Sequence, residues 1–350
     1  MGVMLPALVG MRAVRRSRFD RTGIGIRLCS RHLSTPSSLS AVRNVSYKVG
    51  FMFPGQGAQA VGMAGSLCEE VPSARELFDR ASSILGYDLL DTCMNGPADD
   101  LNSTAVAQPA IFVASMAALE RLKIQDPAAA GRCTVAMGLS LGEYSALCFA
   151  GAFSFEDGVR LTKVRGEAMQ AAANVSRSGM VGVVGLDAAG VAAVCKAAAR
   201  KSGKPISIGN YLMEGNYVVS GAVEACDAVR ELAPTMGARM AVPLAVAGAF
   251  HTSLMQPAVA KLADFLEEMD IKSPRIPVIS NVDAEAHGDA ASIRRKLAQQ
   301  VVTPVQWEAT MKDMLAAPDF EKCYEIGPGS VCKGIIMRFR KRTPIISIPA

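Results

Sequence analysis

The stretch that decides the fold reads Val135-Ala136-Met137-Gly138-Leu139-Ser140-Leu141-Gly142-Glu143-Tyr144. Apolar residues precede the first glycine, and a helix-compatible run, Glu143 to Phe149, follows the second. A serine at the tip of a sharp strand-to-helix turn crowds the residues two positions away on either side, so both must be glycine. The pattern predicts a raised Ser140 hydroxyl aimed at the first amides of a helix, which can stabilise an oxyanion. A serine that only caps a helix is the alternative.

The basic character of the chain is confined to its start. The 350 residues include 37 Lys and Arg and 32 Asp and Glu, but residues 1–48 hold nine of the bases and one acid. The remainder carries 28 bases and 31 acids, a net charge of −3, and so lacks the electrostatic footprint of a nucleic-acid-binding protein. The Arg- and Ser-rich start predicts an organellar transit peptide over residues 1–46, for the mitochondrial matrix or the plastid stroma. A disordered basic tail is the alternative.

Cysteine usage and hydropathy exclude two further classes. The nine cysteines are odd in number and contain no C-x-x-C pair, which predicts free thiols and no zinc site. No run approaches the roughly 18 apolar residues of a membrane span, so we expect none. The length suits one large domain with an insert.

Apolar runs alternate with helix-spaced runs along the body, which predicts a mainly parallel sheet covered by helices on both faces. The strand candidates are Tyr47 to Phe53, Arg132 to Met137, Ile276 to Asn281, Phe320 to Ile326 and Pro344 to Ile348. Between 175 and 246 the order changes to β-α-β-β-α-β, which predicts a ferredoxin-like subdomain. We therefore expect an α/β fold with a large domain over 47–174 and 247–350 and a small subdomain over 175–246.

A nucleophilic serine needs a general base, and the chain offers three histidines. His32 lies in the predicted leader, and His287 lies in a Gly- and Asp-rich loop where we expect it to be solvated. His251 lies where an apolar strand turns into a helix, so elimination assigns it as the base. No acidic third member is identifiable, and a backbone carbonyl or an amide side chain remains possible as the group that orients the imidazole.

One arginine stands out for its position on a predicted helix. The run Phe155 to Ala173 has helical spacing, and Arg165 follows Leu161 by four residues, so it borders the apolar face. A charge beside a buried stripe needs a partner. Arg165 is therefore a candidate functional residue, although a solvated helical arginine is the commoner case.

Six motifs occur together and in order. They are Phe53-Pro54-Gly55-Gln56-Gly57-Ala58-Gln59, the Ser140 stretch, Val164-Arg165-Gly166, Ala249-Phe250-His251, Ser280-Asn281-Val282-Asp283 and Gly327-Pro328-Gly329. From about Val49 to its C-terminus the chain thereby resembles the malonyl-CoA:acyl-carrier-protein transacylases. The resemblance implies an α/β-hydrolase-like large domain with an inserted ferredoxin-like subdomain.

The same resemblance implies roles for six residues. Ser140 would be the acyl-accepting nucleophile, His251 its general base, the Leu141 amide and the Gln56 loop the oxyanion hole, Arg165 the ligand of the malonyl carboxylate, and the main chain of Gln300 the support of the histidine. Leu139 stands where many members carry a histidine, and Phe250 resembles the malonyl-selective form. Malonyl-CoA and acyl carrier protein would be substrate and partner, with no metal or bound cofactor and, we expect, a monomeric enzyme.

Two other functions share these features. A serine esterase or thioesterase of the α/β-hydrolase class would have the same serine turn, but Arg165 and the lack of an HGGG-type loop argue against it. A non-enzymatic acyl-carrier scaffold would not need Ser140 and His251. For docking of an acidic carrier protein the basic candidates are Arg294, Arg295 and Lys296, or Lys333, Arg338 and Arg340.

Overall fold

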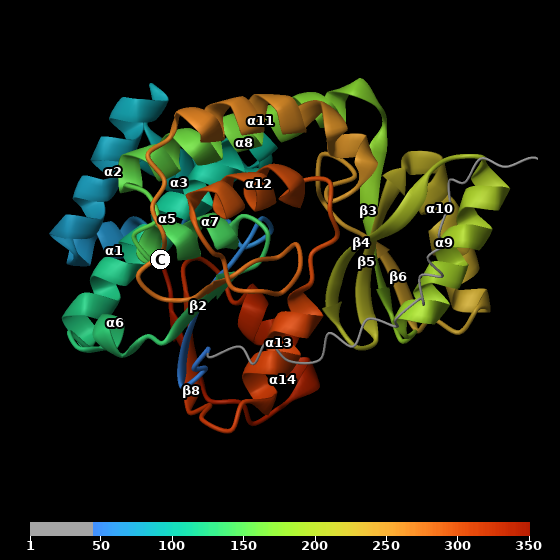
Figure 1. Ribbon diagram of the computed structural model, residues 1–350. Coiled ribbons are helices and arrows are strands. Elements are labelled where there is room, and N and C mark those ends of the chain that lie inside the picture. The colour runs from blue at the N-terminus through green and yellow to red at the C-terminus, as the bar shows by residue number, and fades with distance from the viewer. Residues whose placement is uncertain (1–44) are drawn as a thin grey trace, which may run out of the picture. The chain divides into compact units, whose positions relative to one another are not determined.

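The computed structural model describes residues 45–350, so the predicted leader, 1–46, lies almost wholly outside the described residues. A five-stranded sheet in the order β7-β2-β1-β8-β9 forms the centre of the larger part (Figure 1). All four of its strand pairs are parallel. The strands are β1 (Val49–Phe53), β2 (Val135–Gly138), β7 (Val278–Ile279), β8 (Lys322–Ile326) and β9 (Ile345–Ile348).

The central sheet is buried on both faces, because successive side chains of a strand point to opposite sides. Phe51 and Phe53 of β1 belong to one hydrophobic cluster with residues of α5 (Thr104–Gln125), α7 (Gly142–Phe149) and α8 (Phe155–Val175). Met52 belongs to a second cluster with residues of α13 (Trp307–Ala316) and α14 (Val331–Phe339). The α/β class with a mainly parallel, helix-covered sheet is therefore confirmed.

A four-stranded antiparallel sheet in the order β4-β5-β3-β6 forms the smaller part, with helices α9 and α10 packed against it (Figure 1). Its elements in chain order are β3 (Ser178–Val184), α9 (Ala188–Ser202), β4 (Ile206–Met213), β5 (Asn216–Ala222), α10 (Val223–Thr235) and β6 (Met240–Pro243). They follow the β-α-β-β-α-β order that the sequence indicates for this interval, and the main pattern resumes after them.

The remaining helices all contribute buried residues to the cluster that contains Phe51 and Phe53. They are α1 (Gly65–Glu70), α2 (Pro72–Leu85), α3 (Leu89–Asn95), α4 (Ala98–Asn102), α6 (Ala129–Arg132), the 3-10 turn η1 (Ser253–Met255), α11 (Gln256–Glu268) and α12 (Ala290–Gln300). Helices α1, α3, α4 and α6 were not predicted, because four to seven residues are too few to show helical periodicity.

Helix α5 corrects the expectation that no segment approaches a membrane span. Within its 22 residues an 18-residue window has a mean hydropathy of 1.2, which satisfies the length and composition of a span, but 78% of that window is buried inside the fold. It packs closely on α8, where a side chain at Gly158 would lie 2.2 Å from Phe112 and one at Gly166 would lie 2.6 Å from the Thr104 carbonyl oxygen. The hydropathy of α5 thus reflects a core position.

Candidate active site

The Ser140 turn connects β2 to α7 and depends on its two glycines. A Cβ on Gly138 would lie 1.9 Å from the carbonyl carbon of Gly142, and one on Gly142 would lie 2.1 Å from the Phe53 carbonyl oxygen. Neither position can therefore hold a side chain. Ser140 itself has φ = 52°, a left-handed conformation that costs a non-glycine residue energy and is common at functional sites.

His251 lies next to Ser140. Its Nε2 is 2.8 Å from the Ser140 Oγ, and its Nδ1 is 2.9 Å from the main-chain oxygen of Gln300. Since a carbonyl oxygen only accepts, Nδ1 carries the proton and Nε2 is free to accept one from the serine. A main-chain carbonyl thus occupies the place of an acidic third residue. His251 also has a left-handed backbone, with φ = 63°.

The environment of His251 favours its neutral form. The side chain is buried, and burial lowers its pKa to about 4, with the nearby positive charge of Arg165 as the second cause. The imidazole is therefore unprotonated at neutral pH, as a general base must be.

Arg165 is a buried cation without an anionic partner among the described residues. It is 1% exposed, and its Nη1 donates to Gln108 Oε1 at 2.7 Å while its Nη2 donates to Gln300 Oε1 at 2.8 Å and to Ser140 Oγ at 3.1 Å. Its carbon Cζ lies 4.9 Å from the centre of the Tyr144 ring. All three of these hydrogen-bond acceptors are uncharged, and the Arg165 Nε has no hydrogen-bond partner within residues 45–350. The guanidinium is therefore ready to bind an anion beside Ser140.

Two side chains hold the main chain of the serine turn, Asn281 from the loop after β7 and Gln300 from the end of α12. Asn281 accepts a hydrogen bond from the Ser140 N–H at 2.6 Å and donates to the Gly138 oxygen at 2.8 Å. The Gln300 side chain donates to the Ser140 carbonyl oxygen at 3.0 Å. The sequence motif around Asn281 indicates no role for this residue, and for Gln300 the family resemblance implies a role of the main chain only.

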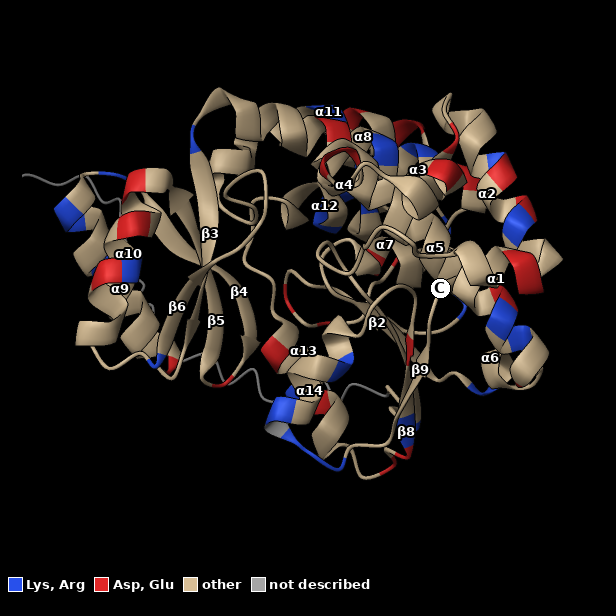
Figure 2. Cartoon of the chain, turned by 180° about the vertical axis from the view of Figure 1, so that it is seen from behind, with Lys and Arg blue, Asp and Glu red and all other residues tan. Residues whose placement is uncertain are grey.

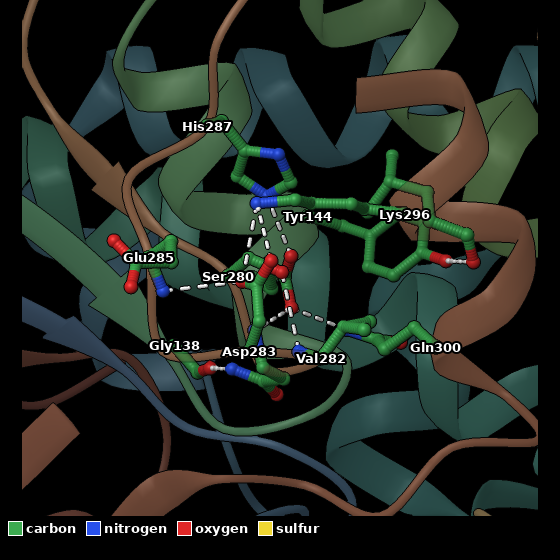
Figure 3. Close-up of polar contacts among 12 residues, drawn as sticks. Gly138, Tyr144, Ser280, Val282, Asp283, Glu285, His287, Lys296 and Gln300 are labelled. Atoms are coloured by element: carbon green, nitrogen blue, oxygen red, sulfur yellow. Dashed lines mark hydrogen bonds and ion pairs between the residues drawn. The ribbon is translucent and has the colours of Figure 1, made fainter. Parts of the chain in front are cut away.

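The expectation that His287 is solvated is wrong. Its side chain is fully buried, and its Nε2 lies 2.6 Å from Glu143 Oε1. The loop folds back on β7, since the His287 N–H donates to the Val278 oxygen at 2.8 Å. In Figure 3 the dashed contacts gather between His287, Gln300 and the 280–283 loop. The missed signal was Glu143 itself, the one charged residue of helix α7.

The two residues expected to form an oxyanion hole lie in the loop after β1 and in the serine turn. Gln56 lies in the loop after β1 and lines the same pocket as Ser140, with its Nε2 3.5 Å from Thr104 Oγ1. Leu141 follows the nucleophile at the start of α7 and is buried. Neither the Gln56 nor the Leu141 main-chain N–H donates to another residue of the described part of the chain, so both can serve a ligand oxygen.

The pocket over Ser140 has a volume of about 180 Å³ and lies between the two sheets. Apolar residues from both parts of the fold line it, among them Met169, Met180, Leu212, Leu244, Phe250 and Ile335. The described residues contain no group of His, Cys, Asp and Glu that could hold a metal ion. The site thus combines a serine, a neutral histidine and a buried cation in a small, mostly apolar pocket.

The chain is similar to known acyltransferases over most of its length. The family of acyl transferase domains matches residues 50–343. The mitochondrial malonyl-CoA-acyl carrier protein transacylase of Mus musculus is 40% identical over 294 residues, which cover 81% of this chain and 77% of that protein. The malonyl CoA-acyl carrier protein transacylase of Salmonella typhimurium is 41% identical over 289 residues, which cover 82% and 91%.

Solved structures agree. The malonyl CoA-acyl carrier protein transacylase from Coxiella burnetii matches with a TM-score of 0.81 and 36% identity, covering 86% of this chain and 93% of that one. A malonyl-transacylase in complex with a type II PKS acyl-carrier protein matches with a TM-score of 0.80 and 34% identity, covering 87% and 96%. The similarity therefore includes both sheets and the pocket between them.

Proposed function

The chain belongs to the malonyl-CoA:acyl carrier protein transacylases, and we propose that it transfers malonyl from malonyl-CoA to the phosphopantetheine thiol of an acyl carrier protein through malonyl-Ser140. One observation carries this proposal. Ser140 Oγ lies 2.8 Å from a neutral histidine and 3.1 Å from a buried guanidinium that no carboxylate of the described chain neutralises. A nucleophile, a base and an anion-binding group therefore converge on one oxygen atom.

In the first half-reaction Ser140 Oγ attacks the thioester carbonyl while His251 Nε2 takes its proton. The main-chain N–H groups of Gln56 and Leu141 stabilise the oxyanion. The carbon–sulfur bond then breaks, and the protonated His251 returns its proton to the CoA thiolate. Gln300, through its main-chain oxygen, keeps the imidazole in the tautomer that this sequence needs.

In the second half-reaction the roles reverse. His251 takes the proton of the incoming pantetheine thiol, the thiolate attacks the malonyl ester, and Ser140 Oγ leaves with the proton from His251. Thioester and oxygen ester are close in energy, so the transfer requires no metal or other resident cofactor.

Arg165 explains why the acyl group is a dicarboxylic one. A guanidinium can bind a carboxylate through two parallel hydrogen bonds. The free carboxylate of malonyl would supply the missing counter-ion of Arg165 and release Ser140 Oγ from it. Phe250, which lines the pocket, leaves little room for a branched acyl group.

The carrier protein would approach over α14. Val331 and Ile335 of this helix line the Ser140 pocket, while Arg338 of the same helix lines a neighbouring cavity of about 420 Å³ together with Arg239. Figure 2 shows basic residues on α14 and on the loop that follows it. The other candidate cluster suits docking less well, because Arg294 is bonded to the Leu266 and Met269 oxygens.

We also propose that the protein works in an organelle, and that it acts there as a monomer. The basic, acid-poor composition of residues 1–48 supports import, and the mouse and human relatives are named as mitochondrial forms. Residues 1–46 fused to a fluorescent protein should direct it to mitochondria, and diffuse fluorescence would count against this location.

Intact-mass measurement tests the proposal directly. Malonyl-CoA should add one malonyl group to the wild-type chain, and a holo carrier protein should then remove it and gain the same mass. Ser140→Ala should lose both the adduct and the transfer while keeping its fold. An adduct that persists on this variant would place the nucleophile elsewhere.

The serine esterase alternative makes a different prediction for the same experiment. With water as the only acceptor, a transferase should release malonate slowly and should transfer quickly once a carrier thiol is added. Fast hydrolysis without any benefit from the thiol would favour the esterase.

A further inference from the structure

A second buried charge lies behind the nucleophile, on the far side of the serine turn from the pocket. The carboxylate of Glu143 is fully buried and receives three donors. His287 Nε2 lies 2.6 Å from Oε1, while Gln300 Nε2 at 2.6 Å and the Asn281 N–H at 2.9 Å bind Oε2. None of these contacts belongs to the transfer chemistry described above.

Two of the three donors belong to the residues that hold Ser140. The Gln300 amide nitrogen also binds the Ser140 carbonyl oxygen, and Asn281 Oδ1 accepts from the Ser140 N–H. Gln300 in addition accepts from Arg165 at 2.8 Å. The Glu143 carboxylate thus holds Asn281 and Gln300, which support the strained backbone of Ser140. Through Gln300 it also orients the guanidinium of Arg165.

His287 is the group that holds the carboxylate from the other side. Lys296, a cation drawn in the same group of residues, pairs with Asp283 instead, at 2.9 Å. Figure 3 shows Lys296 extending across Tyr144 toward Asp283. Without His287, Oε1 would be a buried acceptor with no donor, and an unsatisfied charged oxygen costs more than a neutral one. The carboxylate would then turn toward other partners and release Oε2 from Gln300 and Asn281.

We propose that His287 is a positioning residue that, through the buried carboxylate of Glu143, fixes the Asn281 and Gln300 side chains and thereby sets the geometry of Ser140 and Arg165. His287 does not take part in proton transfer. Its Nε2 is occupied by Glu143, its Nδ1 has no partner among the described residues, and the Ser140 hydroxyl is bonded to His251. The inference rests on the proposed malonyl transfer.

Side-chain reach provides a matched test. The amide nitrogen of glutamine lies the same number of bonds from Cα as His287 Nε2, whereas that of asparagine lies one bond closer and cannot reach Glu143 Oε1. His287→Gln should therefore keep the donor, and His287→Asn and His287→Leu should lose it. Val194→Ala, in the separate hydrophobic cluster of the small sheet, is the control for a general loss of stability.

Two readouts are measured. The first is kcat for malonyl transfer, obtained by dividing the maximal rate by the concentration of chains that form the malonyl adduct. The second is the ratio of kcat/KM for malonyl-CoA to kcat/KM for acetyl-CoA. For His287→Asn and His287→Leu we expect kcat to fall about tenfold to a hundredfold, as for a displaced reacting group, with a lower malonyl preference because Arg165 loses its support. The kcat of His287→Gln should stay within about threefold of the wild-type kcat. Val194→Ala should change neither readout.

The glutamine and asparagine variants decide the outcome even if the leucine variant does not fold, since both keep a polar side chain. Equal kcat values and equal acyl preferences for these two variants would overturn the proposal. So would a fall in melting temperature alone, with unchanged kinetics per active site. Absence of a malonyl adduct on the wild-type chain would instead reject the proposed transferase function.

Discussion

Arg165 and Glu143 are both buried charges close to Ser140, but their surroundings differ. Arg165 is 1% exposed and has only neutral hydrogen-bond partners, two of them glutamines, and it faces the pocket. Glu143 is fully buried, with three donors that include His287, and it faces the interior. The Gln300 side chain accepts a hydrogen bond from Arg165 and donates one to Glu143, so it lies between the two charges.

This difference indicates which of the two charges a ligand of opposite sign would bind. A buried charge that the protein satisfies by itself stabilises the local structure, whereas a buried charge without a counter-ion carries a cost that a ligand of opposite sign relieves. On this reasoning the pocket side is built for an anion and the interior side for rigidity.

The largest effect should follow from His251→Ala. Removal of a general base lowers acylation by roughly 10²–10⁴-fold, and among the described histidines only His251 contacts Ser140. The measurement is the pre-steady-state rate of malonyl adduct formation. His287→Gln is the matched control and should stay close to wild type. The opposite ranking would exchange the roles that we assign to the two histidines.

Arg165→Ala should lower the transfer of malonyl but not that of acetyl. Truncation of one partner of a buried charged pair costs about 2–5 kcal/mol, and at about 1.4 kcal/mol per tenfold the middle of that range corresponds to some two orders of magnitude in kcat/KM. Acetyl-CoA has no carboxylate to lose, so its transfer should not weaken. The measurement is kcat/KM for both acyl-CoAs.

Two variants control the Arg165 experiment. Arg165→Lys keeps the charge but not the planar fork, so it should recover only part of the malonyl preference. Arg160→Ala removes an arginine from the same helix whose side chain is half exposed and paired with Asp157, and it should leave both substrates unaffected. Equal losses of malonyl and acetyl transfer in Arg165→Ala would mean that Arg165 supports the fold or the CoA moiety.

Much of the pocket side could be predicted from the sequence, because its constraints are local. The glycines around Ser140 follow from the sterics of one turn, and the position of Arg165 follows from helical spacing along α8. The choice of His251 needed only elimination among three histidines. The first two inferences use residues close together in the chain, and the third uses only the small number of histidines.

The interior side could not be predicted, because it depends on contacts between distant segments. Glu143 and His287 are 144 positions apart, and the Gln300 side chain reaches Ser140 across 160. The composition of the 282–290 loop indicates exposure, but a short bridge between Ile279 and Ala286 folds the loop back and buries His287. Backbone pairing thus overrode the compositional preference.

The pH dependence of transfer should show that the charge of Arg165 acts on His251. Because burial and Arg165 lower the pKa of His251 to about 4, kcat/KM should fall only as the pH drops toward that value, well below the usual range of histidine. Arg165→Ala should move this acid limb to higher pH. The limb should stay below the usual pKa range of histidine, since burial is the larger cause of the shift. Arg165→Lys keeps the charge and should keep the limb low. Superimposable limbs for the Ala and Lys variants would contradict a charge effect.

The smallest effect should come from charges outside both buried groups. Arg338→Glu reverses an exposed charge on α14, the helix that also lines the Ser140 pocket. Surface ion pairs contribute about 0.2–1 kcal/mol, so the KM for an acidic carrier protein should rise about twofold to fivefold, while the KM for malonyl-CoA stays constant. Arg295→Glu, on α12, is the matched control and should change neither value. Added salt should reduce the difference between wild type and Arg338→Glu, because the Debye length shortens. If Arg295→Glu raises the carrier KM and Arg338→Glu does not, the carrier docks over α12 and not beside α14.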